Sequence, residues 1–149
     1  MRRPAALAAV ATALVPALAG CGSSSVSAHQ LRTGAARACT VAGRRLSRIP
    51  APHDAAGAAA FLHAGITALG PELMALDRLS PTPQLAAPYG RARSATEREL
   101  AALHSTLHRL SAGEDPVVAI KTLQQELAPL ERQASAAWRA LGVPGCLES

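Results

Sequence analysis

Residues 115–141 read DPVVAIKTLQQELAPLERQASAAWRAL. Asp115 suits a helix N-cap, and Pro116 suits the first helical position. Apolar side chains then recur at alternating spacings of three and four residues, which places them on one stripe of a helix. They are Ile120, Leu123, Leu127, Leu130, Ala134, Ala137 and Leu141. The stretch therefore predicts one long amphipathic helix whose stripe needs partners.

Three more segments with helical spacing lie upstream, separated by proline-containing stretches at 49–52, 80–83 and 111–116. Proline disfavours helix in the residue before it and suits a helix start, so these stretches end one helix and begin the next. The upstream stripes are Leu31, Ala35, Ala38, Ala42, Leu46 and Ile49; Leu62, Ile66, Leu69, Leu73 and Leu76, behind an Asp54 cap; and Leu100, Leu103, Leu107 and Leu110. We predict an all-α, up-down-up-down four-helix bundle.

Pro71, Pro88 and Pro129 fall inside the predicted helices. Each proline removes a backbone hydrogen bond, so each is expected to bend or break its helix. We therefore expect proline-kinked helices, and the second and third segments are expected to divide into shorter helices.

The N-terminus has the layout of a signal peptide: Arg2 and Arg3, an apolar run over 5–19, and small residues before Cys21. The run of 15 residues is shorter than the roughly 20 that a transmembrane helix needs, so a permanent span is the less favoured alternative. Ordinary secretion, with Cys21 free or oxidised, is the other alternative.

Leu18-Ala19-Gly20-Cys21 resembles the lipobox of bacterial lipoproteins. This resemblance implies cleavage before Cys21 and acylation of that cysteine, with chains such as palmitate. We accordingly predict a lipoprotein signal peptide over 1–20, a lipidated cysteine and flexible tether over 21–28, and a helical domain over 29–149. The expected location is the extracytoplasmic face of the cell membrane.

The mature chain would have 129 residues, enough for one domain with one core. Removing Arg2 and Arg3 leaves 13 Lys and Arg against 10 Asp and Glu, so the net charge falls to +3. A nucleic-acid partner is therefore not expected. Two cysteines, Cys39 and Cys146, remain, and in an oxidising compartment they favour a disulfide. A redox or metal role is the alternative, but no CxxC spacing supports it.

The first and fourth helices would be antiparallel neighbours, so the tail 142–146 can turn back and bring Cys146 to Cys39. The proposed disulfide and the proposed topology thus support each other. Cysteines near both ends of a short helical domain are also similar to those of uncharacterised actinobacterial lipoproteins, a resemblance that implies no function.

His104 and His108 are four residues apart on one helix face and form a weak candidate for a divalent metal site. A third ligand, such as His63, cannot be placed from the sequence, so no metal or other cofactor is predicted. The Glu-x-x-His repeats of di-iron bundles are absent from the sequence, which excludes that enzymatic use of the fold.

Charged residues on two helices are interpreted as surface groups. The first helix carries Arg32, Arg37, Arg44, Arg45 and Arg48 without an acidic residue. These arginines are expected to be solvated or to pair with Glu126 and Glu131, although contact with anionic headgroups is an alternative. Glu97 and Glu99 are interpreted as members of surface ion pairs with Arg93, Arg98 and Arg109.

No nucleophile elbow, phosphate-binding loop or dinucleotide fingerprint occurs, so no enzyme activity and no catalytic residue is predicted. The expected function is a membrane-anchored, non-enzymatic domain that binds a protein or envelope partner. The alternative is a small-ligand carrier or sensor, with lipid in an alanine-lined groove near Trp138 or a divalent metal at His104 and His108.

Overall fold

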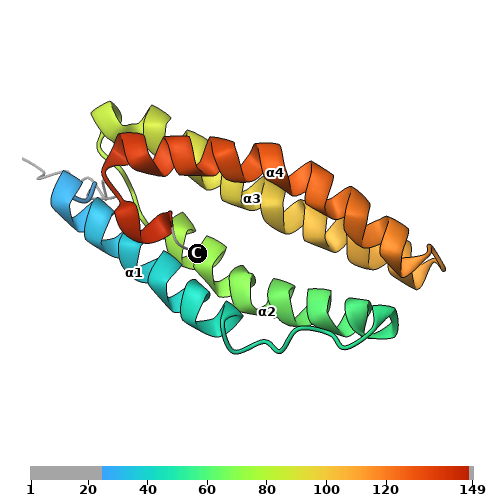
Figure 1. The fold of residues 1–149 in the computed structure, drawn as a ribbon. Coiled ribbons are helices and arrows are strands. Elements are labelled where there is room, and N and C mark those ends of the chain that lie inside the picture. Colours follow the sequence, from blue (N-terminus) through green and yellow to red (C-terminus); the bar gives the residue numbers. More distant parts are fainter. Residues whose placement is uncertain (1–24, 148–149) are drawn as a thin grey trace, which may run out of the picture.

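The computed structural model describes residues 25–147, whose regular secondary structure is entirely helical. Four helices run alternately up and down (Figure 1). They are α1 (Ala28–Leu46), α2 (Ala58–Asp77), α3 (Pro83–Ser111) and α4 (Pro116–Leu141), with short 3₁₀ turns η1 (Ala55–Gly57) and η2 (Pro144–Cys146). The predicted all-α bundle is confirmed.

Side-chain caps start the first helix and the last. Ser27 and Gln30 form a reciprocal capping box at α1, with distances of 3.2 Å from the Gln30 amide to Ser27 Oγ and 2.9 Å from the Ser27 amide to Gln30 Oε1. Asp115 accepts hydrogen bonds from the amides of Val117 and Val118 at 2.9 and 3.1 Å, as its position predicted.

The second helix begins slightly later than its predicted cap. Asp54 accepts from the Gly57 amide at 3.1 Å and therefore caps the turn η1, while α2 itself begins at Ala58. The chain before α1 also differs from the predicted tether, because the Val26 amide donates to the Ser80 carbonyl at 2.8 Å. Val26 and Ser27 thus belong to the folded domain.

Each helix that contains an internal proline continues through it. Pro71 lies inside α2, Pro88 inside α3 and Pro129 inside α4. The expectation that the second and third segments divide was wrong. One proline costs a helix interior about 3 kcal/mol, which the apolar contacts of a long bundle helix can offset.

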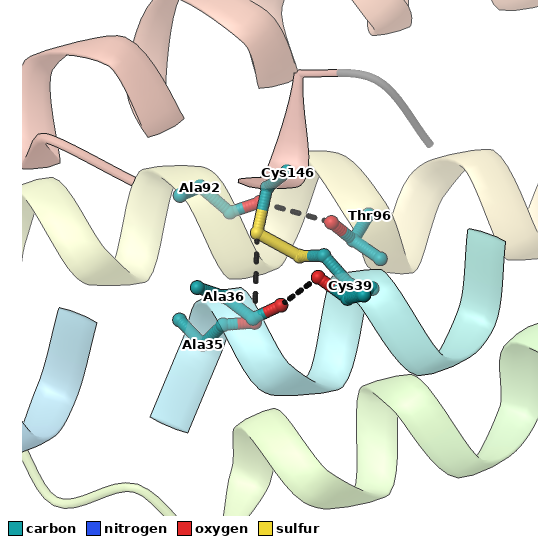
Figure 2. Close-up of a disulfide and its surroundings, with 7 residues drawn as sticks. Ala35, Ala36, Cys39, Ala92, Thr96 and Cys146 are labelled. Carbon is teal, nitrogen blue, oxygen red and sulfur yellow. Dashed lines mark hydrogen bonds between the residues drawn. A yellow bond between two sulfur atoms is a disulfide. The ribbon is translucent and has the colours of Figure 1, made fainter. Parts of the chain in front are cut away.

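The C-terminal segment folds back onto α1. Gly142 ends α4 in the left-handed region (φ 69°), where glycine has no steric penalty, and the Val143 amide bonds to the Trp138 carbonyl at 3.0 Å. The turn η2 then brings Cys146 to Cys39, and their Cα atoms lie 5.0 Å apart across the predicted disulfide. Figure 2 shows this disulfide beside Ala35 of α1, whose carbonyl lies 3.6 Å from Cys146 Sγ.

The closed core surrounds this disulfide, and we call that part of the bundle the disulfide end. Tyr89 and Trp138 meet edge to face with ring centroids 6.2 Å apart, and Tyr89 Oη donates to the Leu76 carbonyl at 2.6 Å. The other buried members are Leu31, Ala35, Ala38, Cys39, Leu76, Ala92, Ala95, Ala134, Leu141, Val143 and Cys146. Every helix therefore contributes to the closed core.

The first helix is too short to cover the whole bundle. It has 19 residues, whereas α3 has 29 and α4 has 26, so it spans about 28 Å of a bundle roughly 40 Å long. It runs along α2 and contacts η2, and it meets the end of α4 where Arg32 Nε donates to the Leu141 carbonyl at 2.8 Å. Beyond α1, the stripes of α2, α3 and α4 face one another without a fourth helix.

Loss of the disulfide should destabilise the closed core. The bridge closes a separation of 107 residues, for which the chain-entropy model gives roughly 4 to 5 kcal/mol as an upper figure. We expect the double variant Cys39→Ala, Cys146→Ala to show a lower urea midpoint than the unaltered protein. A reductant should lower the midpoint of the unaltered protein but not that of the variant; equal midpoints throughout would contradict the assigned role.

Candidate functional site

A cavity of about 340 Å³ opens between α2, α3 and α4, next to the disulfide end. Leu46, the last residue of α1, and Ile49 after it border the cavity where α1 stops. Most of the lining is apolar, and it includes Phe61, Leu62, Leu69, Leu73, Leu100, Leu103, Leu127, Ala134 and Trp138. The volume lies at the small end of the roughly 300–1,000 Å³ typical of small-molecule sites.

The leucines of the cavity belong to the predicted stripes but are only partly covered. Leu69 and Leu73 of α2, Leu100 and Leu103 of α3, and Leu127 of α4 are all of intermediate exposure. By contrast, Leu31 and Leu76 at the disulfide end are at most 1% exposed. The stripes therefore point inward as predicted, but they line a space rather than a filled core.

Helix α2 is unusually apolar for a surface helix. By length and composition alone, the segment Ala55–Asp77 could cross a membrane, and little of its most apolar part is buried. Several of its partly exposed apolar residues, Phe61, Leu69 and Leu73 among them, line the cavity. The cavity thus accounts for much of the apolar character of this helix.

Glu72 is the most unusual side chain of the cavity. It lies on α2, is 6% exposed, and makes no hydrogen bond or ion pair to any of residues 25–147. Burial disfavours the charged form and raises the pKa of this carboxyl to about 7. A buried carboxyl without a partner costs folding free energy, because water solvates it in the unfolded chain.

Two more carboxyls border the same cavity, Glu99 on α3 and Glu131 on α4. Glu99 is half-buried and Glu131 is exposed. Burial, and next the negative charges of Glu131 and Glu72, raise the pKa of Glu99 to about 7, while Arg98 acts in the opposite direction. The three acids are therefore close enough to interact electrostatically.

Sequence reasoning did not identify Glu72 and misjudged Glu99. Glu97 does pair with Arg93, at 3.7 Å, and Arg93 also pairs with Asp77. Glu99, however, lies in the cavity instead of forming a surface ion pair, so that interpretation was wrong. The sequence does contain a signal that Glu72 points inward. It lies three residues after Leu69 and four before Leu76, on the apolar face of its helix.

The structure brings no third ligand to the predicted histidine pair. His104 and His108 lie exposed on α3, and His63 lies exposed on α2. Across residues 25–147, no group of three or more His, Cys, Asp and Glu side chains is placed to hold a metal ion. The cavity carboxyls likewise do not form such a group.

The arginines expected on the first helix are exposed, as predicted for a solvated face; they are Arg32, Arg37, Arg44, Arg45 and Arg48. Arg32 caps the end of α4 through the Leu141 carbonyl. Glu126, expected as a possible partner, pairs instead with Arg109 at 3.6 Å, and Arg109 also pairs with Glu114 at 3.1 Å. Within the described part of the chain, no ion pair joins an arginine of α1 to α4.

An alanine-lined groove was expected near Trp138, but the space beside this residue is lined mainly by leucines. Trp138 is 2% exposed and borders the leucine-lined cavity, in which Ala134 is the alanine of the lining. A separate surface groove between α3 and α4 is lined by Ala87, Ala136, Ala137 and Ala140, together with polar residues such as Arg91 and Arg98. The apolar space beside Trp138 is therefore lined mainly by leucine.

Three predictions concern residues outside 25–147: the signal peptide at 1–20, the acylation of Cys21, and the start of the tether. No protein-family model matches the chain, and neither the curated proteins nor the solved structures include a match. The functional argument thus rests on the cavity and its carboxyls.

The stability of the protein should fall as pH rises, because the folded pKa of Glu72, about 7, exceeds the ordinary value of 4.5. Between these pH values the folded state binds more protons than the unfolded state, so the free energy of unfolding decreases with pH. The loss from Glu72 approaches about 3 kcal/mol above pH 7.

Glu72→Gln removes this titration, so the variant should be more stable than the unaltered protein at pH 8 and closer to it at pH 5. Urea unfolding at the two pH values measures the difference. Glu97→Gln, which removes an exposed carboxyl outside the cavity, is the matched control and should leave the pH dependence unchanged. Parallel pH curves for Glu72→Gln and the unaltered protein would disprove the assignment.

Proposed function

We propose that this protein is a non-enzymatic carrier or sensor that holds a small, largely apolar molecule in the cavity between α2, α3 and α4. One observation carries the proposal: the facing stripes of three helices leave a leucine-lined space of about 340 Å³ unfilled. Protein interiors are normally close-packed, and an unfilled space costs stability. Because α1 ends at Leu46, it does not cover this part of the bundle, and an apolar ligand would bury the leucines there instead.

A binding role suits the polar groups of this lining better than a catalytic role. Apart from the glutamates, the hydroxyl groups in the lining belong to Thr96 and Ser135, and Thr96 Oγ1 donates to the Ala92 carbonyl at 3.4 Å (Figure 2). Cys146, also in the lining, is held in the disulfide and offers no thiol. Among residues 25–147, neither lining hydroxyl is hydrogen-bonded to a cavity carboxyl, so no nucleophile is paired with a base there.

Fewer structural features support the binding of a protein partner, which was the function first expected from the sequence, than support the binding of a small ligand. Large exposed apolar side chains in the described residues are Phe61, Met74, Val117 and Val118. Phe61 borders the cavity, and the others lie on two different helices. Scattered apolar residues of this kind are normal on a monomer surface, so the cavity favours ligand binding over partner docking.

We further propose that the domain works at the extracytoplasmic face of the membrane, held there by acyl chains on Cys21. The lipobox residues support this proposal. Because the fold begins by Val26, the intervening residues would keep the domain within roughly 20 Å of the lipid. An apolar ligand could then pass between the bilayer and the cavity over a short distance.

The anchor has a direct test in the intact mass of the protein purified from its own membranes without reductant. We expect a mass for residues 21–149 plus acyl chains, which increases by two hydrogen masses on reduction of the disulfide. A mass that includes residues 1–20, or that lacks acyl chains, would refute the proposed attachment but would leave the cavity unaffected.

Filling the cavity should abolish ligand binding. Gly65 lines the cavity, and a Cβ atom added there meets nothing within 4 Å, so the side chain of Gly65→Leu can enter the space without disturbing α2. Gly90→Leu is the matched control, because Gly90 is also helical with an open Cβ position but lies outside the cavity. Both substitutions should also favour helix.

We expect decanol to change the fluorescence of Trp138, the single tryptophan, in the unaltered protein and in Gly90→Leu but not in Gly65→Leu. Native mass spectrometry of the same three proteins from source membranes should show a bound small molecule in the first two. Equal binding by all three proteins would mean that the ligand lies elsewhere, and binding by none would refute the proposed function.

A further inference from the structure

The charged residues that line the cavity are all acidic. Among residues 25–147, its ionisable lining residues are Glu72, Glu99 and Glu131, and this part of the chain contributes no Lys, Arg or His to the lining. The acids come from three different helices, so each wall of the cavity that is formed by α2, α3 or α4 contributes one carboxyl. The residues that border it from α1 and the following loop, Leu46 and Ile49, are uncharged.

The basic group that acts on Glu99 also bonds to other residues. Arg98 of α3 lowers the pKa of Glu99, but its own donors bond to the Ser94 carbonyl at 3.2 Å and to Gln133 Oε1 at 3.0 Å. Glu72 receives no such compensation, since burial is the cause of its raised pKa. Across residues 25–147, no cation is paired with Glu72.

The buried position of Glu72 sets it apart from an ordinary acidic patch. Its side chain is 6% exposed and lines a mostly apolar cavity, where the charged form of a carboxyl is unfavourable unless a cation lies beside it. The carboxyls are not arranged as a metal-binding group, and an anionic ligand would add to the repulsion among them. A positively charged group on an apolar ligand would supply the missing partner.

We propose that the ligand of this cavity is a small amphipathic cation, with an apolar body against the leucines and one basic nitrogen paired with Glu72. This inference rests on the proposed ligand-binding function and names the chemical class of its ligand. The volume of about 340 Å³ equals roughly eleven water molecules, so the buried part of the ligand has on the order of ten non-hydrogen atoms. Glu99 and Glu131, which line the same cavity, would be secondary contacts for the positive charge.

The pairing makes binding sensitive to pH. The cation prefers the ionised form of Glu72, which competes with its protonated form near pH 7. The affinity for a cation should therefore rise between pH 5.5 and pH 8, whereas that for an uncharged molecule of the same length should stay nearly constant. Glu99, Glu131 and Arg98 are the other charged groups that act on the site, and ionisation of Glu99, whose pKa is also raised to about 7, adds to the same trend.

Three probes of equal chain length test the inference: decylammonium, decanol and decanoate, titrated at pH 8 against Trp138 fluorescence. The two ionic probes are kept below their micelle concentrations, and decanol is kept below its solubility limit. An ion pair with a hydrogen bond between two charged groups is stronger than the bond of a neutral hydroxyl, so decylammonium should bind at least tenfold more tightly than decanol. Decanoate should bind most weakly. In Glu72→Gln the advantage of decylammonium over decanol should fall about tenfold, while Glu97→Gln should retain it.

The outcomes separate the ligand class from the function itself. If decanol binds as tightly as decylammonium, or if decanoate binds best, the cavity is a ligand site but the inference about charge is wrong. If Glu72→Gln keeps the full preference for decylammonium, Glu72 is not the partner, and the inference is again overturned. If none of the three probes binds, the proposed function fails together with the inference. The comparison among probes uses the unaltered protein, so it does not depend on the folding of a variant.

Discussion

The length of α1 is the constraint on which the rest of this structure depends. Its 19 residues cover the disulfide end of the bundle and stop at Leu46, while α3 and α4 continue beyond it. Where α1 is present, every helix contributes to a closed core around Trp138 and the disulfide. Where α1 is absent, the same helices keep their apolar stripes but enclose a cavity.

This division assigns different roles to the two halves of the bundle. The disulfide end gathers features that stabilise a fold, namely a covalent bridge, an aromatic pair and a buried hydroxyl bonded to a helix carbonyl. The cavity gathers features that cost stability, namely partly exposed leucines and the unpaired carboxyl of Glu72. Rigid surroundings that support a destabilised site are typical of binding proteins, because proteins tolerate such costs where function requires them.

The sequence predicted the helices and the disulfide well because both depend on local or one-dimensional signals. Asp115 and the stripe of α4 are local helix signals, whereas the pairing of Cys39 with Cys146 was predicted from the number of cysteines and the expected topology. The stripes did not reveal the cavity, since periodicity identifies the apolar face of a helix but not whether another helix covers it. Pro71 and Pro88 misled for a related reason, because tertiary contacts hold their helices together despite the lost hydrogen bonds.

Glu72 and Glu99 show where a close look at the sequence could have gone further. Each acid interrupts an apolar stripe at helical spacing, and a charge in that position is either exposed at the stripe's edge or buried for a reason. Only the arrangement of three helices distinguishes these cases. The lipobox prediction for Cys21 depends neither on helix periodicity nor on how the helices pack, since it rests on the N-terminal residues alone.

Glu72 lies in a mostly apolar cavity without a partner among residues 25–147, and an NMR titration of its side-chain carboxyl carbon tests this assignment. Without added ligand, the titration midpoint should lie near the folded pKa of about 7. Saturation with decylammonium should lower that midpoint, because a paired cation stabilises the carboxylate. A midpoint near the ordinary value of 4.5 in the free protein would contradict the account, since the carboxyl would then be solvated and would need no partner.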